Sequence, residues 1–319
     1  MTKHLITGVA GFIGSTLAET LLRSGLSVVG VDSLTDYYPV ENKQKNLAAL
    51  QEFSRFEYLN EDILAMSTEL HQAVNDCSVI YHQAGQPGVR GSWSDGFDDY
   101  VERNVLATQK LLECIEDKPG TKFVYASSSS VYGNADSWPC TETAVPKPFS
   151  PYGVTKLAAE HLVTLYAENF GLNSVSLRYF TVYGPKQRPD MAFTRFINAA
   201  IHSDTITVYG DGEQIRDFTY VSDIVEANIR AGQTGGNGAI YNLSGGSHAT
   251  VNEVLEILER VHGEPLKVER VAQQAGDVRR TGGDSTNARE QLGWEPQVAI
   301  ADGIARQYAW QKANQRTMG

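Results

Sequence analysis

The sequence is poor in cysteine, and the spacing of its cysteines and histidines indicates neither a cross-link nor a metal centre. Its three cysteines, Cys77, Cys114 and Cys140, are odd in number, far apart and without a C-x-x-C pair. Small disulfide-dependent domains carry even sets of cysteines. The seven histidines are scattered and form no H-E-x-x-H arrangement. We therefore expect ordinary reduced thiols and no bound metal.

The sequence also lacks a surplus of positive charge and any long apolar run. Its 27 Lys and Arg against 38 Asp and Glu give a net charge of -11, whereas a nucleic-acid surface needs a basic face. The apolar runs are shorter than the roughly 18–20 residues that span a bilayer, and no basic leader precedes the first strand-like segment. We expect a soluble, cytoplasmic protein with a small-molecule ligand, no nucleic-acid partner and no membrane partner. An anionic ligand would need arginines that converge locally, and Arg188, Arg216 and Arg279 are the candidates.

The first half of the chain alternates short β-branched runs with longer amphipathic stretches, which is typical of parallel strands joined by crossover helices. Strands are predicted at residues 5–7, 27–31, 56–59, 79–82, 122–126 and 174–179. Helices are predicted at residues 12–24, 41–53, 100–115 and 152–169. The predicted fold class is α/β, a Rossmann-type doubly wound parallel sheet with a smaller α/β C-terminal lobe.

Beyond residue 179 the alternation becomes irregular and is interrupted by Gly-Pro and Arg-Pro turns. Short strands are predicted at residues 206–209 and 217–219, helices at 251–260 and 300–312, and a flexible surface turn at 232–238. Single cores stop growing near ~250–300 residues, and this chain has 319. We expect a larger domain over residues 1–180 and a ligand-binding lobe over 181–319, with the chain crossing between them.

A glycine-rich turn, T-G-V-A-G-F-I-G at residues 7–14, follows the first predicted strand and opens the first helix. Its backbone N–H groups and the positive helix end can hold a pyrophosphate, although G-x-x-G-x-x-G alone also fits an ordinary tight turn. Asp32 ends the second strand, where a carboxylate can accept hydrogen bonds from an adenosine ribose. Its charge would repel the 2′-phosphate of NADP, and no arginine follows directly, so the predicted cofactor is NAD. The predicted cofactor-binding residues are Gly8, Gly11, Phe12, Ile13, Gly14, Asp32, Asp62, Ile63, Gln83, Ala84, Tyr152 and Lys156.

A candidate catalytic set combines Tyr152 and Lys156, one helical turn apart, with four serines at residues 127–130 after the fifth strand. An ammonium ~4 Å from the phenol at an effective dielectric of ~20 contributes about 4 kcal/mol, which would lower the phenol pKa by roughly three units. Tyr152 could then take a proton from a substrate hydroxyl while Ser128 hydrogen-bonds the reacting oxygen. The predicted catalytic residues are therefore Tyr152, Lys156 and Ser128.

These motifs together resemble the extended short-chain dehydrogenase/reductase family: the glycine-rich turn, the serines followed by V-Y-G at 131–133, and Y-G-x-x-K at 152–156. R-Y-F at 178–180, Y-G-P at 183–185 and R-P-D-M at 188–191 resemble the nucleotide-sugar epimerases of that family. The resemblance implies tightly held NAD, a UDP-sugar substrate bound by the C-terminal lobe, and a homodimer through the helices around 100–116 and 152–169. Gly85 stands where many relatives have Ala and Val9 where many have Gly, but neither change removes a functional group.

The resemblance also indicates the reaction. Related dehydratases and decarboxylases carry a carboxylate just before V-Y-G, where this chain has Ser129 and Ser130. Elimination of water then lacks its acid/base group, and epimerisation remains. Thr181 and Arg188 resemble the residues that the UDP-glucuronic acid 4-epimerases carry at these positions. A hydroxyl group and a guanidinium are suited to bind the carboxylate of the sugar.

The implied substrate contacts extend into the C-terminal lobe, with Asn104 near the active site. The predicted substrate-binding residues are Pro87, Arg90, Ser128, Ser129, Ser130, Thr181, Arg188, Val208, Tyr209, Arg216 and Arg279. The predicted function is NAD-dependent C4 epimerisation of UDP-glucuronic acid to UDP-galacturonic acid through a transient 4-keto intermediate. Two alternatives are a UDP-glucose/UDP-galactose 4-epimerase and a non-catalytic NAD-binding protein of the same fold, the second disfavoured by the intact catalytic set.

Overall fold

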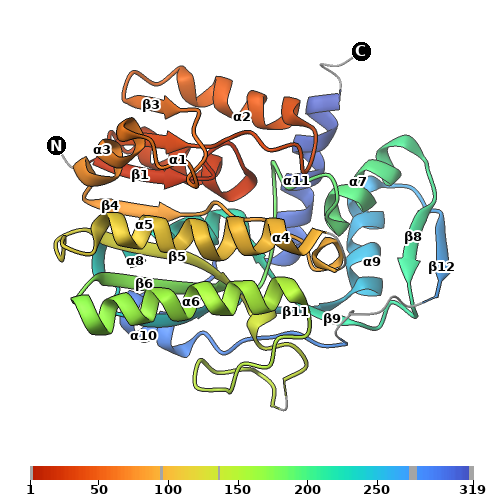
Figure 1. Cartoon of the computed structure of the whole chain (residues 1–319). Helices are drawn as coiled ribbons and strands as arrows, with labels where there is room; N and C mark the ends of the chain where they lie inside the picture. Colours follow the sequence, from red (N-terminus) through yellow and green to blue (C-terminus); the bar gives the residue numbers. More distant parts are fainter. Residues whose placement is uncertain (1–2, 94–95, 136, 273–278, 316–319) are drawn as a thin grey trace.

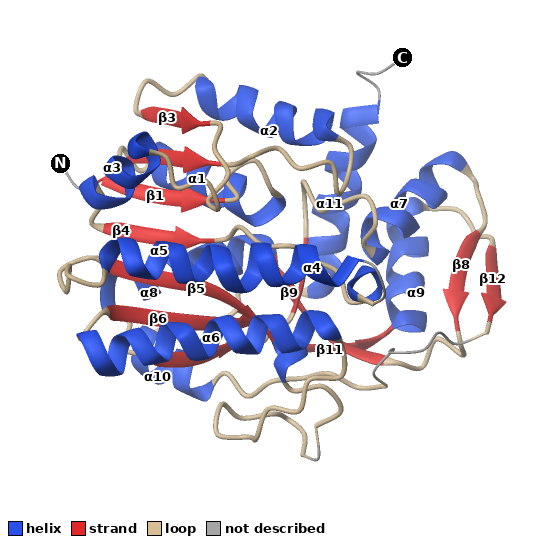
Figure 2. Cartoon of the chain, in the orientation of Figure 1, coloured by secondary structure: helices blue, strands red, loops and turns tan. Residues whose placement is uncertain are grey.

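The computed structural model describes residues 3–93, 96–135, 137–272 and 279–315, and it is built around one seven-stranded parallel sheet (Figures 1 and 2). The strands of this sheet are β1 (Lys3–Thr7), β2 (Ser27–Val31), β3 (Phe56–Leu59), β4 (Val79–His82), β5 (Lys122–Ser128), β6 (Asn173–Tyr179) and β10 (Ala239–Leu243). Their spatial order is β10-β6-β5-β4-β1-β2-β3. The strand order reverses between β1 and β4, and in doubly wound sheets ligands bind at such a crevice. The predicted fold class is confirmed.

Helices cover both faces of this sheet (Figure 1). One face carries α1 (Phe12–Arg23), α2 (Val40–Gln51), α8 (Val221–Thr234) and α10 (Thr286–Leu292); the other carries α3 (Thr68–Asp76), α4 (Phe97–Tyr100), α5 (Ala107–Ile115) and α6 (Pro151–Phe170). Successive strand residues alternate between two buried cores, since Ile6 packs with α1 and α8 whereas Leu5 packs with α3 and α5. Strands buried on both faces read as continuous apolar runs, which is why their positions are visible in the sequence.

The predicted helix at 100–115 belongs to a longer helical run that contains an irregular turn. The run begins with α4, continues as a π-helix, η3 (Val101–Leu106), and ends as α5. A π turn accommodates one extra residue and is often found at functional sites. Here it lies beside the crevice between β1 and β4, because Asn104 bonds to the loop that follows β4.

Helix α6 has end signals that match its prediction. The Ser150 side chain accepts a hydrogen bond from the backbone N–H of Gly153, and Pro151 occupies the first turn. Gly171 ends the helix in the left-handed conformation that glycine favours. These caps fix the start of α6 and thereby place Tyr152 in its first turn, at the carboxyl edge of the sheet.

A smaller lobe lies at one end of the sheet (Figure 2). It contains a three-stranded sheet, β11-β9-β7, a two-stranded sheet, β12-β8, and three helices. These elements are β7 (Thr181–Tyr183), β8 (Ile206–Tyr209), β9 (Ile215–Tyr220), β11 (Ser247–Thr250), β12 (Val268–Val271), α7 (Ala192–His202), α9 (Val251–His262) and α11 (Ile300–Gln315).

The second half of the chain contributes to both parts of the molecule. After β9 the chain returns to the large sheet, where α8 covers one face and β10 pairs in parallel with β6. Eight elements were not predicted from the sequence: α3, α7, α8, α10, β7, β10, β11 and β12. The turn predicted over 232–238 is wrong in part, because α8 continues to Thr234 and Gly232 lies within it against Tyr81.

None of the described helices has both the length and the apolar character needed to cross a membrane. Within the same residues, no group of three His, Cys, Asp or Glu side chains is arranged to hold a metal ion. Cys77, Cys114 and Cys140 are all free.

Candidate functional site

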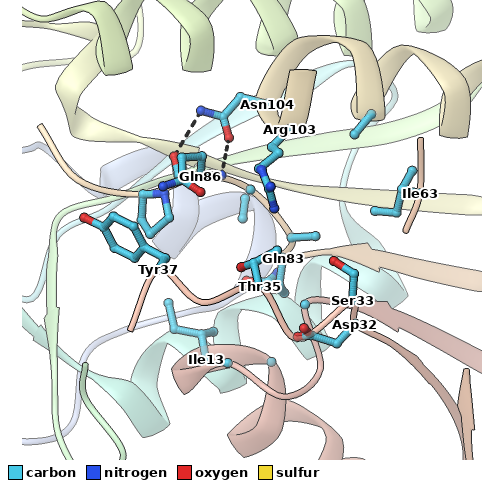
Figure 3. A pocket seen from close by; sticks show the side chains of 18 of the residues that line it. Ile13, Asp32, Ser33, Thr35, Tyr37, Ile63, Gln83, Gln86, Arg103 and Asn104 are labelled. Carbon is cyan, nitrogen blue, oxygen red and sulfur yellow. Dashed lines mark hydrogen bonds between the residues drawn. The ribbon is translucent and has the colours of Figure 1, made fainter. Parts of the chain in front are cut away.

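A pocket opens at the carboxyl edge of the large sheet, at the crevice between β1 and β4 (Figure 3). Its walls come from the glycine-rich turn, the loops after β2, β3 and β4, the η3 turn and the start of α6. The lining includes every residue predicted to bind the cofactor: Gly8, Gly11, Phe12, Ile13, Gly14, Asp32, Asp62, Ile63, Gln83, Ala84, Tyr152 and Lys156. These predicted cofactor-binding residues come from five separate segments of the chain and meet in one cavity.

The glycine-rich turn is tight because two of its glycines leave no room for a side chain. Gly8 has φ +67°, and a Cβ there would lie 2.8 Å from the backbone nitrogen of Ala84. A Cβ on Gly14 would lie 2.2 Å from the carbonyl oxygen of Gly8. The backbone of the turn thus faces the pocket at the start of α1, where helix N–H groups favour an anion.

The Asp32 carboxylate has structural partners as well as a place in the pocket. It accepts hydrogen bonds from the backbone N–H groups of Ala10, at 3.1 Å, and Leu34, at 2.8 Å. Lys43, from α2, places its Nζ 3.9 Å from the carboxylate and donates to the backbone carbonyl of Thr35 at 2.8 Å. The sequence prediction did not include Lys43, because it lies 11 residues beyond Asp32 on a mostly polar helix.

Tyr152, which lines the pocket, interacts with the side chain of Ser128. Ser128 ends β5, Tyr152 lies in the first turn of α6, and their side chains form a hydrogen bond. Burial raises the pKa of Tyr152, while this bond and the charge of Arg188 act in the opposite direction. The predicted lowering of the phenol pKa is wrong in direction here, because burial outweighs the favourable groups and Lys156 is not among them.

Lys156 is buried, and its Nζ lies 4.3 Å from the centre of the Tyr125 ring. Burial lowers the pKa of Lys156 to about 7, and the carboxylate of Glu160, one turn further along α6, opposes that change. A lysine whose pKa is close to neutrality can exchange a proton near physiological pH. Lys156 lines the same pocket as Tyr152.

A buried ion pair holds the helix that carries Tyr152 and Lys156 against the large sheet. Arg178 of β6 binds Glu160 through two hydrogen bonds, Nε to Oε2 at 3.0 Å and Nη2 to Oε1 at 2.6 Å, and both side chains are at most 3% exposed. Glu160 also accepts a hydrogen bond from Ser127 at 2.6 Å. The pair joins α6 to β6, and Ser127 links it to β5. Its role was not predicted although Arg178 lies in a quoted motif.

Asn104, from the π turn, joins the loop after β4 to the catalytic helix. Its side chain accepts from the backbone N–H of Gln86 at 2.8 Å and donates to the Gln86 carbonyl at 3.1 Å. It also donates to Thr155 at 3.0 Å, and Thr155 in turn donates to the carbonyl of Tyr152 at 2.9 Å. The predicted place of Asn104 near the active site agrees with this geometry.

The predicted substrate residues are only partly gathered at the pocket. Pro87 and Arg188 line it. Arg188 pairs with Asp190 at 2.9 Å, and its guanidinium carbon lies 5.7 Å from the centre of the Tyr37 ring. Ser129 and Ser130 are half-buried in the 3₁₀ turn η4 (Ser129–Val131), directly after β5, and Thr181 is half-buried at the start of β7.

The remaining predicted residues lie further out, around the smaller lobe. The guanidinium carbon of Arg90 is 4.7 Å from the centre of the Tyr209 ring, so the loop after β4 contacts β8. Val208 is 1% exposed and packs in the core. Arg216 is half-buried on β9 and Arg279 is exposed.

The fold and the site together define a nucleotide-binding α/β protein of the short-chain dehydrogenase/reductase type. Residues 5–307 match the model of the family described as GDP-mannose 4,6 dehydratase. The chain therefore belongs to this family.

Two curated relatives and one solved structure resemble the chain over nearly its whole length. A UDP-glucuronate 4-epimerase of Thermodesulfobacterium geofontis is 39% identical, over 98% of this chain and 97% of the relative. A Bacillus subtilis protein described as an uncharacterized UDP-glucose epimerase is 39% identical, over 97% of each chain. The crystal structure of UDP-glucuronic acid 4-epimerase from Bacillus cereus, in complex with UDP-glucuronic acid and NAD, superposes with a TM-score of 0.93 at 40% identity, covering 98% of this chain and 100% of that one.

Proposed function

We propose that this protein is an NAD-dependent 4-epimerase that converts UDP-glucuronic acid to UDP-galacturonic acid. The observation that carries the proposal is that Tyr152, hydrogen-bonded to Ser128, lines the same cavity as the glycine-rich turn and Asp32. This arrangement sets an acid/base group in the wall of the pocket that carries the predicted cofactor-binding residues. The likeness to the Bacillus cereus epimerase, crystallised with NAD and UDP-glucuronic acid, supports the same cofactor and substrate.

The pocket residues fit NAD in chemical character. The backbone of the glycine-rich turn suits the pyrophosphate, and the Asp32 carboxylate suits the adenosine ribose. When bound, NAD supplies an acceptor that takes hydrogen from C4 of the sugar and gives it back. The chain's own residues hold the cofactor, orient the sugar and manage the proton.

Tyr152 is the proton acceptor in this proposal. Its phenolic oxygen takes the proton of the 4-hydroxyl, and Ser128 holds the reacting oxygen at hydrogen-bond distance. Lys156, with its pKa near 7, stabilises the phenolate electrostatically when protonated. The same groups return the proton after the ketone has rotated within the pocket. Because the hydrogen taken from C4 is also given back, the overall reaction is redox neutral.

The sugar carboxylate is the proposed source of specificity. Hydroxyl groups of Ser129, Ser130 and Thr181 lie at the ends of β5 and β7, and Arg188 adds a guanidinium at the pocket wall. Tyr209, Arg216 and Arg279 are proposed to hold the uridine diphosphate.

A UDP-glucose 4-epimerase is the second candidate, favoured by the name of the Bacillus subtilis relative. Incubating the purified protein with UDP-glucuronate or UDP-glucose, followed by separation of the sugar nucleotides, tests the two. We expect UDP-galacturonate to form and UDP-glucose to turn over far more slowly. Faster turnover of UDP-glucose would reverse the assignment, and no product from either substrate would favour a binding protein.

We also propose that the protein is a homodimer through the outer faces of η3 and α6. Val101 and Leu106 on η3, and Val154 and Leu165 on α6, are between 38% and 50% exposed, and the two helices pack side by side. Exposed apolar side chains that gather on one surface mark association sites. The double variant Val154→Glu, Leu165→Glu should be monomeric by light scattering, whereas Val145→Glu, in an exposed loop, should remain dimeric. A monomeric wild type would contradict the proposal.

A further inference from the structure

Arg103 lines the pocket from the π turn η3. Figure 3 shows its side chain extending from the helix into the cavity, toward the side that holds Ser33 and Thr35, while the neighbouring Asn104 turns to Gln86. No motif in the sequence marks it, because it precedes Asn104 in an amphipathic helix and resembles an ordinary surface arginine.

The guanidinium of Arg103 is largely unused within the described part of the protein. Its one ion pair there is with Asp99, whose Oδ1 is 3.7 Å from Nε, too far for a good hydrogen bond. Asp99 is 56% exposed and Arg103 is 32% exposed, and such surface pairs contribute little. Nε itself is buried and has no hydrogen-bond partner among the described residues. An unpaired buried donor costs free energy, and because Arg103 lines the cavity, pairing its guanidinium with a ligand there would offset that cost.

The ligand expected in that part of the cavity is anionic. The glycine-rich turn presents the start of α1 to one side of the pocket, and Arg103 reaches in from η3 (Figure 3). Lys43, the other cation on this side, already donates to Thr35 and lies 3.9 Å from the Asp32 carboxylate. Among the described residues on this side, Arg103 is the cation with a buried donor, Nε, that has no hydrogen-bond partner. Arginine binds phosphate oxygens through two parallel hydrogen bonds, which a helix end alone does not supply.

We propose that Arg103 binds the pyrophosphate of the dinucleotide from the η3 side of the pocket, and so acts as a clasp that retains the cofactor. This inference rests on the proposed function, because it takes NAD as the occupant of the pocket. The helix end and Arg103 would then hold the two phosphates from separate elements of the fold. The π turn would contribute by presenting Arg103 to the phosphates and Asn104 to the catalytic helix from adjacent positions.

The test is the binding of NAD, ADP and adenosine to protein freed of nucleotide, measured by calorimetry. Arg103→Ala should weaken NAD and ADP about tenfold or more, the range of one charge-assisted hydrogen bond, and leave adenosine unchanged. Arg103→Lys should recover part of the loss. Asp99→Asn, the matched control that removes the weak ion pair on the same helix, should bind NAD at least as well as the wild type. Raising the ionic strength should weaken NAD binding more in the wild type than in Arg103→Ala.

Equal affinities of wild type and Arg103→Ala for NAD and ADP would overturn the clasp. An equal loss for adenosine and ADP would also overturn it, because that pattern indicates stacking on the adenine. The proposed function is tested by a different measurement. A wild type that binds NAD but yields no UDP-galacturonate would refute the proposed epimerase activity, whereas the role of Arg103 would still be decided by the binding data. A wild type that binds no NAD would refute both.

Discussion

The Nδ1 atom of His82 lies 2.7 Å from Oγ1 of Thr7, at the crevice between β4 and β1. On the other side of the ring, Nε2 lies 3.0 Å from Oγ1 of Thr108, which donates its hydrogen to the carbonyl of Asn104 at 2.7 Å. Because Thr108 has spent its only hydrogen, Nε2 must carry the ring hydrogen, and Nδ1 accepts from Thr7. His82 therefore links the glycine-rich turn to the π turn as a neutral ring.

This buried ring predicts a loss of stability in acid. Burial, aided by the charge of Lys156, lowers the pKa of His82 from 6.5 to about 3. Between these values the unfolded chain binds a proton that the folded chain does not, so stability rises with pH and is lost as pH falls from 6.5 toward 3. Urea unfolding of His82→Phe at several pH values should show lower stability at pH 7 and a shallower pH dependence. His71→Phe, at an exposed position, should keep the wild-type slope; the same slope in His82→Phe would contradict the assignment.

Removing the phenol of Tyr152 should separate catalysis from folding. Tyr152→Phe keeps the ring and its packing but lacks the proton acceptor, so turnover should fall by about 10²–10⁴-fold. Its free energy of unfolding should change by no more than about 1 kcal/mol, the value of the lost bond to Ser128. Kinetics and denaturant unfolding on the same preparation measure both quantities. Activity within a few-fold of the wild type would remove Tyr152 from the role of base.

The charge of Asp32 should govern the choice between NAD and NADP. Asp32→Asn removes the negative charge and keeps one oxygen, which can accept one of the two backbone bonds that the carboxylate accepts from Ala10 and Leu34 through separate oxygens. Lys43, whose Nζ lies 3.9 Å from the Asp32 carboxylate, would then lose that opposing charge, so NADP binding should improve while NAD binding weakens. Asp32→Ala should show the same change in preference with an added loss of stability. An unchanged NAD/NADP ratio in calorimetric titrations would mean that Asp32 only holds the loop.

The roles of the glycine-rich turn, Asp32 and Tyr152 could be predicted from the sequence. Each lies directly beside a strand or helix that the neighbouring residues are enough to predict. Lys43, Arg103 and the Glu160–Arg178 pair could not be predicted, since each acts through a partner that the fold brings from a distant segment. His82 illustrates the same limit, because its partners Thr7 and Thr108 come from β1 and α5. Strand β10 was missed because its short, partly polar run becomes a core strand only through pairing with β6.

Arg188 should control a side reaction of the proposed substrate. A 4-keto uronic acid is a β-keto acid and can lose carbon dioxide once its carboxylate rotates freely. Fixed hydrogen bonds from Ser129, Ser130 and Thr181, with Arg188 shaping the pocket, could separate the competing barriers by several kcal/mol. Arg188→Ala should therefore release a 4-keto-pentose nucleotide beside residual epimer, detected by NMR. Lys186→Ala, which removes the neighbouring cation that pairs with Glu19, should give epimer alone. An Arg188→Ala variant that is inactive and yields no decarboxylated product would refute the carboxylate contact.

The most direct test of the account follows the hydrogen on C4. UDP-glucuronate carrying deuterium at C4 is incubated with the protein and NAD in ordinary water, and the UDP-galacturonate is examined by mass spectrometry and NMR. Removal and return of that hydrogen within the pocket predicts that the product retains the deuterium at C4. Replacement of the deuterium by hydrogen from water, or a product altered at another carbon, would contradict the proposed mechanism.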